Sequence, residues 1–127
     1  MWGTVTMGYR SSHNEQSVHA EELRQTLLAL DAKVNLRYPS VAKFIDTENP
    51  RITPATLQIE QALRRTEYIT WAAAWGWRVM DGYGAFLADP RGLAALLNTD
   101  GFHPNAEGSK LRARLLANIL GLAVIIP

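Results

Sequence analysis

The chain has 127 residues, of which 47% are hydrophobic, and this predicts a single domain with a buried core. Its 13 basic and 12 acidic residues leave a formal charge of +1, which provides no electrostatic basis for binding nucleic acid or an anionic membrane. The lack of cysteine excludes disulfides, thiol nucleophiles and thiolate metal sites. No signal peptide and no segment long enough to span a bilayer is visible, so we expect a soluble protein whose location the sequence does not indicate.

The first half of the chain predicts a strand, a helix and a second strand. Residues 2–9 are rich in β-forming residues and predict the first strand. Apolar residues from Val18 to Val34 recur with helical spacing and predict a helix that ends before Pro39. The short apolar run Val41–Asp46 predicts the second strand.

The second half continues this alternation. Thr53 and Pro54 predict the start of a second helix, with Thr53 as the capping residue, and Gly76 predicts its end after Trp75. Residues 77–81 predict a third strand followed by a loop, "GYGAF". After it we expect a short helical or irregular piece, a final helix and a short buried strand in the tail, at residues 93–97, about 106–120 and near the C-terminus, respectively.

This order of elements predicts the fold class α/β, as a three-layer αβα fold with a small parallel sheet. Two of the predicted strands end in an acid, Asp46 and Asp81. Ligands of open α/β sheets bind beyond the carboxyl ends of the strands, so either acid could support a site there. The alternative is that each acid caps the loop or helix that follows it.

The sequence "DGFHPNAEG", residues 100–108, carries the clearest chemical signal. A carboxylate that accepts a hydrogen bond from Nδ1 of a histidine fixes the imidazole tautomer, leaves Nε2 as a base and stabilises the imidazolium. Asp100 and His103 have the spacing for this arrangement, Pro104 restrains the backbone and Asn105 can cap the following helix. The alternative is a helix entrance in which Asp100 caps a backbone N–H and His103 is solvated.

The same nine residues resemble the last conserved block of the SGNH (GDSL-type) hydrolases, D-x-x-H-P-N-x-x-G. The resemblance implies an SGNH-hydrolase-like (flavodoxin-like) fold, possibly incomplete, over residues 1–127. It also implies that Asp100 is the acid and His103 the general base of a Ser-His-Asp triad. "WRVMDGYGAF" is similar to the last strand of that fold and "GTVTMGY" to a preceding strand.

The chain departs from this family in its first half. The Gly-Asp-Ser block with the nucleophile and the Gly-x-Asn-Asp block of the oxyanion hole are not present. The resemblance therefore covers the C-terminal half of a family domain. Ser11 or Ser12 follows the first predicted strand, where a nucleophile could lie, but the surrounding motif does not fit, and the simpler interpretation is that Ser12 or Asn14 caps the helix.

Two classes of function remain open. The first is an esterase domain that hydrolyses ester or acetyl groups on a small molecule, lipid or glycan, with the serine supplied by a missing segment or a second polypeptide. The second is a non-catalytic structural or binding module derived from a hydrolase, for instance in a phage virion or tail. Neither requires a metal or an organic cofactor.

Other conspicuous residues have simpler explanations. We expect Trp71, Trp75 and Trp77 to pack between helix and sheet rather than to stack on sugars. Arg64–Arg65 should lie on a solvated helix face, and so should His13 and His19, whose neighbours are acidic.

Overall fold

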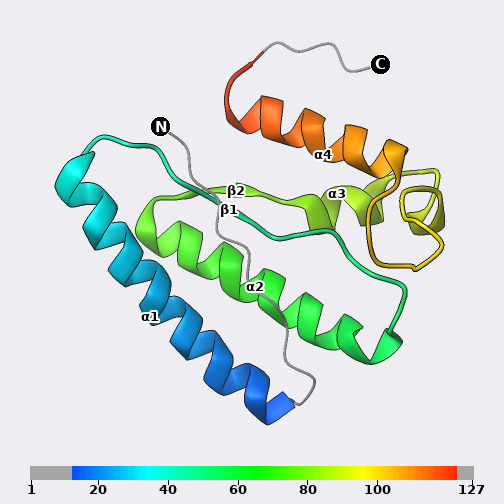
Figure 1. Cartoon of the computed structure of the whole chain (residues 1–127), viewed down its shortest axis with the longest axis horizontal. Helices are drawn as coiled ribbons and strands as arrows, with labels where there is room; N and C mark the ends of the chain where they lie inside the picture. Colours follow the sequence, from blue (N-terminus) through cyan, green and yellow to red (C-terminus); the bar gives the residue numbers. More distant parts are fainter. Residues whose placement is uncertain (1–12, 123–127) are drawn as a thin grey trace.

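A computed structural model describes residues 13–122 of the chain, with side chains from residue 20 onward (Figure 1). Both the strand expected at residues 2–9 and the one expected at the end of the tail lie outside the described residues. The elements, in chain order, are α1 (His13–Arg37), β1 (Phe44–Asp46), the 3-10 helix η1 (Ala55–Leu57), α2 (Gln58–Trp75), β2 (Arg78–Met80), α3 (Gly82–Ala88), the 3-10 helix η2 (Leu93–Ala95) and α4 (Ala106–Ile119).

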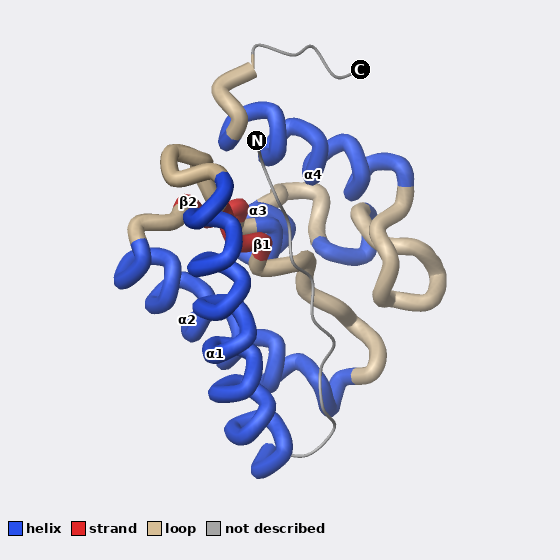
Figure 2. The backbone as a smooth tube through the Cα atoms, turned by 60° about the vertical axis from the view of Figure 1, so that its left-hand side comes forward, coloured by secondary structure: helices blue, strands red, loops and turns tan. Residues whose placement is uncertain are grey.

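The centre of the described fold is a small parallel sheet. β1 pairs with β2 in parallel, and Ile45 lies opposite Val79. Helices α1 and α2 lie together on one side of the two strands and α4 lies on the other, as Figures 1 and 2 show from two directions. This arrangement confirms the predicted αβα layering, although both strands are shorter than predicted.

The alternation of side chains along the strands divides the core between the two faces of the sheet. Ile45 points toward α1 and α2, where it packs in a cluster with Leu23, Leu27, Tyr68 and Ala72. The tryptophans Trp71, Trp75 and Trp77 also pack against this cluster, as predicted, but each remains partly exposed.

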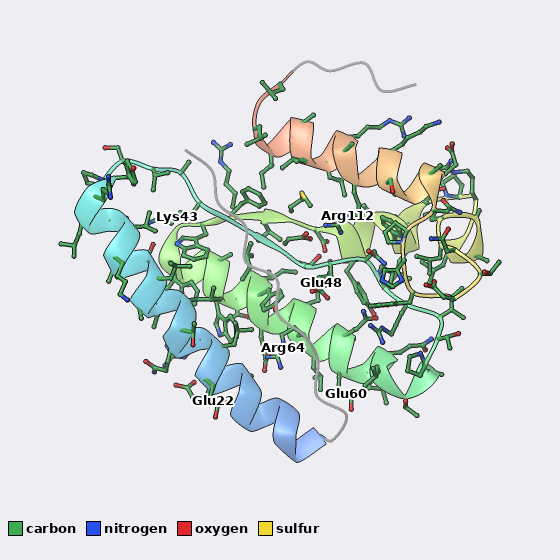
Figure 3. The ribbon with its side chains drawn as sticks, in the orientation of Figure 1. Glu22, Lys43, Glu48, Glu60, Arg64 and Arg112 are labelled. Atoms are coloured by element: carbon green, nitrogen blue, oxygen red, sulfur yellow. The ribbon has the colours of Figure 1, made fainter. Side chains whose placement is uncertain are left out.

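The opposite face of the sheet is covered by α4. Phe44 and Met80 pack there against Ile119, with Leu115 and Leu120 at the edge of the cluster. The next residue on this face of β1 is Asp46, and it forms an ion pair with Arg112 of α4 (Figure 3). The contact with α4 is therefore apolar at the start of the strands and ionic at the end of β1.

The start of the second helix differs from the prediction. α2 begins at Gln58, after the turn η1, and no side chain caps either of them, so Thr53 is not a helix cap. Thr53 instead donates its backbone N–H to the carbonyl of Gly101, 3.2 Å away. The predicted end is correct, because Gly76 closes α2 with a left-handed φ of 71°.

The segment "GYGAF" is helical, so its prediction as a loop was wrong. Asp81 caps α3 by accepting a hydrogen bond from the backbone N–H of Gly84 at 3.1 Å. Two glycines in five residues disfavour a helix in isolation. The helix forms because Asp81 caps it and because Phe86 is fully buried against Leu96 and Leu97.

The two arginines of α2 do not form a solvated face. The side chain of Arg64 is 3% exposed and pairs with Glu67 (Figure 3). Arg65 donates two hydrogen bonds to the carboxylate of Asp81, at 2.9 and 2.6 Å. Both arginines therefore form ion pairs with carboxylates of the fold.

Within residues 13–122, no helix is long and apolar enough to cross a membrane.

Candidate functional site

The segment "DGFHPN" forms a closed turn between η2 and α4. Leu97 and Pro104 face each other in an antiparallel bridge, and Asn98 N–H donates to the carbonyl of His103 at 2.8 Å. Within this loop Gly101 N–H donates to the carbonyl of Asn98 at 2.9 Å. The backbone is therefore bonded on both sides of Asp100 and His103.

Asp100 and His103 make the contact that their spacing predicts. Nδ1 of His103 lies 2.6 Å from Oδ2 of Asp100. The other carboxylate oxygen accepts the backbone N–H groups of Phe102 and His103, at 2.9 and 3.0 Å. The carboxylate thus does both things the sequence left open, because it caps two backbone groups and also orients the imidazole.

These three hydrogen bonds determine the charge of Asp100. The hydrogen bond with His103, followed by those from the two backbone N–H groups, lowers the pKa of Asp100 to about 2. An ionised carboxylate can only accept hydrogen bonds, so Nδ1 of His103 must be the donor. In the neutral imidazole this leaves the lone pair on Nε2. The side chain of His103 is 64% exposed, so it can be reached from outside.

Gly101 makes the close turn possible. Its φ is 67°, and a Cβ at this position would lie 2.8 Å from Oγ1 of Thr53. Its carbonyl accepts N–H groups from Ile52 and Thr53, at 2.8 and 3.2 Å. A side chain would therefore separate the turn from residues 52–53, which follow β1.

Phe102 is held by residues that the sequence analysis did not identify. The side chain of Asn49 donates to its carbonyl at 3.2 Å, and the guanidinium of Arg51 lies 3.9 Å from its ring centroid. The ring of Phe102 in turn packs edge-on against His103, with centroids 4.3 Å apart. This series of contacts connects His103, through Phe102, to Asn49 and Arg51.

The loop that carries Asn49 and Arg51 is itself fixed to α2. Gln61, which is 2% exposed, accepts from the backbone N–H of Arg51 at 3.0 Å and donates to the carbonyl of Asn49 at 3.3 Å. These residues lie about fifty positions before His103, and no local pattern pointed to them. Their place just after the carboxyl end of β1 is the one signal that could have suggested them.

Asn105 and Gly108 join the turn to α4. Oδ1 of Asn105 caps the helix by accepting from Glu107 and Gly108, while its Nδ2 donates to the carbonyls of Ala95 and Leu97. A Cβ on Gly108 would lie 2.2 Å from the carbonyl oxygen of Leu96, so only glycine allows this approach. The structural roles predicted for these two positions thus have specific contacts.

Asp46 and Asp81 do not contact the Asp100–His103 pair. Asp46 binds Arg112 and the backbone N–H of Glu48, and Asp81 binds Arg65, Thr47 and Gly84. The hydrogen bond with Arg65 is the largest cause of a lowered pKa of Asp81. Of the two interpretations from the sequence, the structural one applies, because both acids join the ends of the strands to neighbouring elements.

The described residues contain neither a nucleophile at this site nor a metal cluster. Among side chains from residue 20 to 122, no serine hydroxyl forms a hydrogen bond with His103. Ser11 and Ser12 lie outside the described residues. Over the described part of the chain, no three His, Asp or Glu side chains are grouped as ligands for a metal ion.

Comparison with known proteins places this geometry in a fold class. No protein-family model matches the chain, and no curated protein sequence matches it. Solved structures do match it, among them an esterase domain and a GDSL-like lipase. The esterase domain of the ORF1 protein from the zebrafish ZfL2-1 retrotransposon matches with a TM-score of 0.67 and 19% identity, over 80% of this chain and 59% of that one. A protein described as a GDSL-like lipase from Parabacteroides merdae matches with a TM-score of 0.68 and 15% identity, over 94% of this chain and 60% of that one.

The chain therefore has an SGNH/GDSL-type fold, which confirms the fold that the D-x-x-H-P-N-x-x-G block implied. It spans about three fifths of the length of these two solved chains.

Proposed function

We propose that the chain is the acid–base part of an SGNH/GDSL-type serine hydrolase acting on carboxylic esters. The observation that carries this proposal is the Asp100–His103 contact of 2.6 Å in an exposed, rigidly bonded turn. The likeness to an esterase domain and a GDSL-like lipase supports it, and ester-bearing small molecules, lipids or glycans are the substrate classes to test. The reaction requires no metal or organic cofactor.

The proposed chemistry assigns one task to each residue. Nε2 of His103 takes the proton of a serine hydroxyl as the serine oxygen attacks the ester carbonyl carbon. The protonated imidazole, stabilised by the carboxylate of Asp100, then gives this proton to the departing alcohol. Water hydrolyses the acyl-enzyme in the same way, and His103 acts again as base and then as acid.

The serine and the oxyanion-hole donors have to come from outside the described residues. Either Ser11 or Ser12 provides the nucleophile, or a further segment or second polypeptide does. Oxyanion donors each contribute on the order of 3 kcal/mol to transition-state stabilisation. A chain without them should therefore hydrolyse esters very slowly even if His103 is correctly placed.

The test is labelling with a fluorophosphonate serine probe. The full chain is compared with its Ser11→Ala, Ser12→Ala and His103→Ala variants. Labelling that is lost in one serine variant and in His103→Ala supports a hydrolase with its own nucleophile. If neither the wild type nor any variant is labelled, the chain has no reactive nucleophile of its own, and the same assay is repeated with any extended form of the chain that its source gene encodes.

A non-catalytic binding module is the competing function. The observation in its favour is that apolar side chains of α2, Ile59 and Leu63, are 69% and 45% exposed. These two side chains are four residues apart and therefore share one face of the helix, where a partner could cover them. Failure of both the chain and its extended form to react with the probe would favour this function over hydrolysis.

A further inference from the structure

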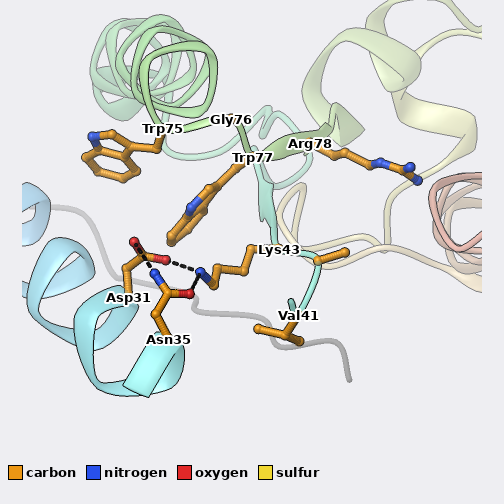
Figure 4. A pocket seen from close by; sticks show the side chains of 9 residues that line it. Asp31, Asn35, Val41, Lys43, Trp75, Gly76, Trp77 and Arg78 are labelled. Carbon is orange, nitrogen blue, oxygen red and sulfur yellow. Dashed lines mark hydrogen bonds and ion pairs between the residues drawn. The ribbon is translucent and has the colours of Figure 1, made fainter. Parts of the chain in front are cut away.

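A second candidate site lies at the opposite end of the sheet from His103. Asp46 and the loop that holds the His103 turn follow the carboxyl ends of the strands, whereas a pocket of about 230 Å³ opens where the strands begin. Three segments form its walls: the last turns of α1, the connection before β1 and the turn from α2 to β2. The side chains used below are Asp31, Asn35, Lys43, Trp75, Trp77 and Arg78 (Figure 4).

Two indole rings form the apolar wall. Gly76, in a left-handed conformation, reverses the chain between Trp75 and Trp77, and their rings meet edge to face with centroids 5.2 Å apart. Both rings pack against the core cluster on one side, and each remains partly exposed where it lines the pocket. Because the two rings are inclined at 64° to each other, one of them can offer its face to the apolar C–H face of a ligand ring while the other borders it.

The facing wall is polar. Lys43 contacts both Asp31 and Asn35, and Nδ2 of Asn35 donates to Asp31 at 3.3 Å (Figure 4). An ammonium has three donors and an amide nitrogen has two, so one donor on Lys43 and one on Asn35 remain for a ligand after these contacts. The carboxylate of Asp31 provides further acceptor positions. One wall thus offers both donors and acceptors, opposite the indoles (Figure 4).

The polar wall of the pocket contains one cationic and one anionic side chain. These two side chains, Lys43 and Asp31, form an ion pair. Arg78 points away toward α4, where it donates to the carbonyl of Ile119 at 2.9 Å (Figure 4). The two charged side chains of the polar wall thus neutralise each other, which favours a neutral ligand with several hydroxyl groups over an ion.

The volume limits the size of this ligand. Pockets for drug-sized ligands measure about 300–1,000 Å³, and this one is smaller. It can contain one six-membered ring with its substituents. A neutral ring with an apolar C–H face and hydroxyls at its rim is the chemistry of a pyranose sugar.

We propose that this pocket binds one uncharged pyranose ring, either as a free monosaccharide or as the terminal residue of a glycan. The ring stacks on Trp77, and its hydroxyls bond to Asp31, Asn35 and Lys43. The pocket contains neither Asp100 nor His103, so the proposal does not depend on the hydrolase function. It would give the domain a way of binding glycans that is separate from any ester chemistry.

The test is an NMR titration of the 15N-labelled full chain. D-Glucose, D-galactose and N-acetyl-D-glucosamine are added to about 100 mM, a range in which dissociation constants of millimolar order saturate the site. We expect at least one sugar to shift the indole N–H signals of Trp75 and Trp77 saturably, while signals of α4 stay unchanged. An oligosaccharide that ends in the same sugar then distinguishes a free monosaccharide from a glycan terminus. If the oligosaccharide binds more tightly than the monosaccharide, the natural ligand is a glycan.

Two alanine variants on exposed positions of α1 make the test specific. Asn35→Ala removes a ligand contact, and we expect affinity to fall about two- to tenfold, the effect of one lost hydrogen bond. Lys33→Ala, on the same helix but outside the pocket, should bind like the wild type. The proposal is overturned if no sugar gives a saturable shift, if the shifts map to other parts of the chain, or if Asn35→Ala binds as the wild type does.

Discussion

Replacing Gly108 by alanine should destabilise the protein, although helix propensity predicts the opposite. Gly108 lies in the first turn of α4, and alanine is favoured over glycine in a helix interior by about 1 kcal/mol. The added Cβ, however, would lie 2.2 Å from the carbonyl oxygen of Leu96, more than an ångström closer than the 3.4 Å at which ordinary contacts begin. Because this neighbour is backbone, it cannot rotate away.

The expected loss of stability follows from the hydrogen bonds that would break if α4 moved away from Leu96. Asn105 forms three hydrogen bonds to this segment, from its backbone N–H to the carbonyl of Leu96 and from Nδ2 to those of Ala95 and Leu97. At about 1 kcal/mol each, their loss costs on the order of 3 kcal/mol. After the gain in propensity, we expect the free energy of unfolding to fall by about 2 kcal/mol.

The assay is equilibrium unfolding in urea, with the midpoint and the slope fitted separately. Ser109→Ala is the matched control, because it also introduces alanine, at the next position of the same helix, where the side chain is exposed and no new Cβ is added. This control should be as stable as the wild type or slightly more so. A Gly108→Ala variant with an unchanged or raised midpoint would refute the close approach of α4 to Leu96.

Three further predictions concern the carboxylates and the helix cap. Asn105→Ala should lower the free energy of unfolding by about 2 kcal/mol or more, since it removes the cap and both side-chain hydrogen bonds to carbonyl groups. Asn105→Asp should recover about 1 kcal/mol of this loss because it keeps the acceptor. Urea unfolding measures both variants, and an equal loss in the two would contradict the capping role. The lowered pKa of Asp81 means that its ion pair with Arg65 stabilises the fold above the unfolded-state pKa, about 3.9, and that this contribution is lost as the pH falls below it. The difference in melting temperature between wild type and Asp81→Asn should therefore be largest above about pH 5 and shrink toward pH 3, and a difference that does not change with pH would contradict it. Finally, the Nδ1–H proton of His103 should give a hydrogen-bonded NMR signal that persists in acid until the carboxyl of Asp100, with its pKa of about 2, becomes protonated. Asp100→Asn should abolish or shift this signal at every pH. An unaltered spectrum in this variant would show that the contact does not form.

The local sequence determined most of the candidate site. Asp100 and His103 contact each other within the turn, and the side chain of Asn105 caps the helix that the turn enters. Contacts of three or four residues' separation depend on local backbone geometry, so a short pattern is enough to predict them. The helix ends at Pro39 and Gly76 were predictable for the same reason.

The tertiary structure decided what the neighbours of that turn are. The contacts of Asn49 and Arg51 with Phe102 join segments about fifty residues apart, and nothing in either segment alone indicates the other. The helix at "GYGAF" also depends on tertiary contacts, since burial of Phe86 outweighs the low helix propensity of its two glycines.

Helix α2 shows most clearly what the local sequence determines and what the tertiary structure decides. Its buried residues are Glu60, Gln61, Arg64, Tyr68 and Ala72, while Ile59 is 69% exposed. Hydropathy alone would predict the reverse, with Ile59 buried and the charged Glu60 and Arg64 exposed. The sequence by itself determined that a helix forms here and where it ends, because propensity and a terminal glycine act locally. Which face is buried depends on the partners that satisfy Arg64 and on the sheet and α1 packed against Tyr68 and Ala72, and those are defined only when the chain is folded.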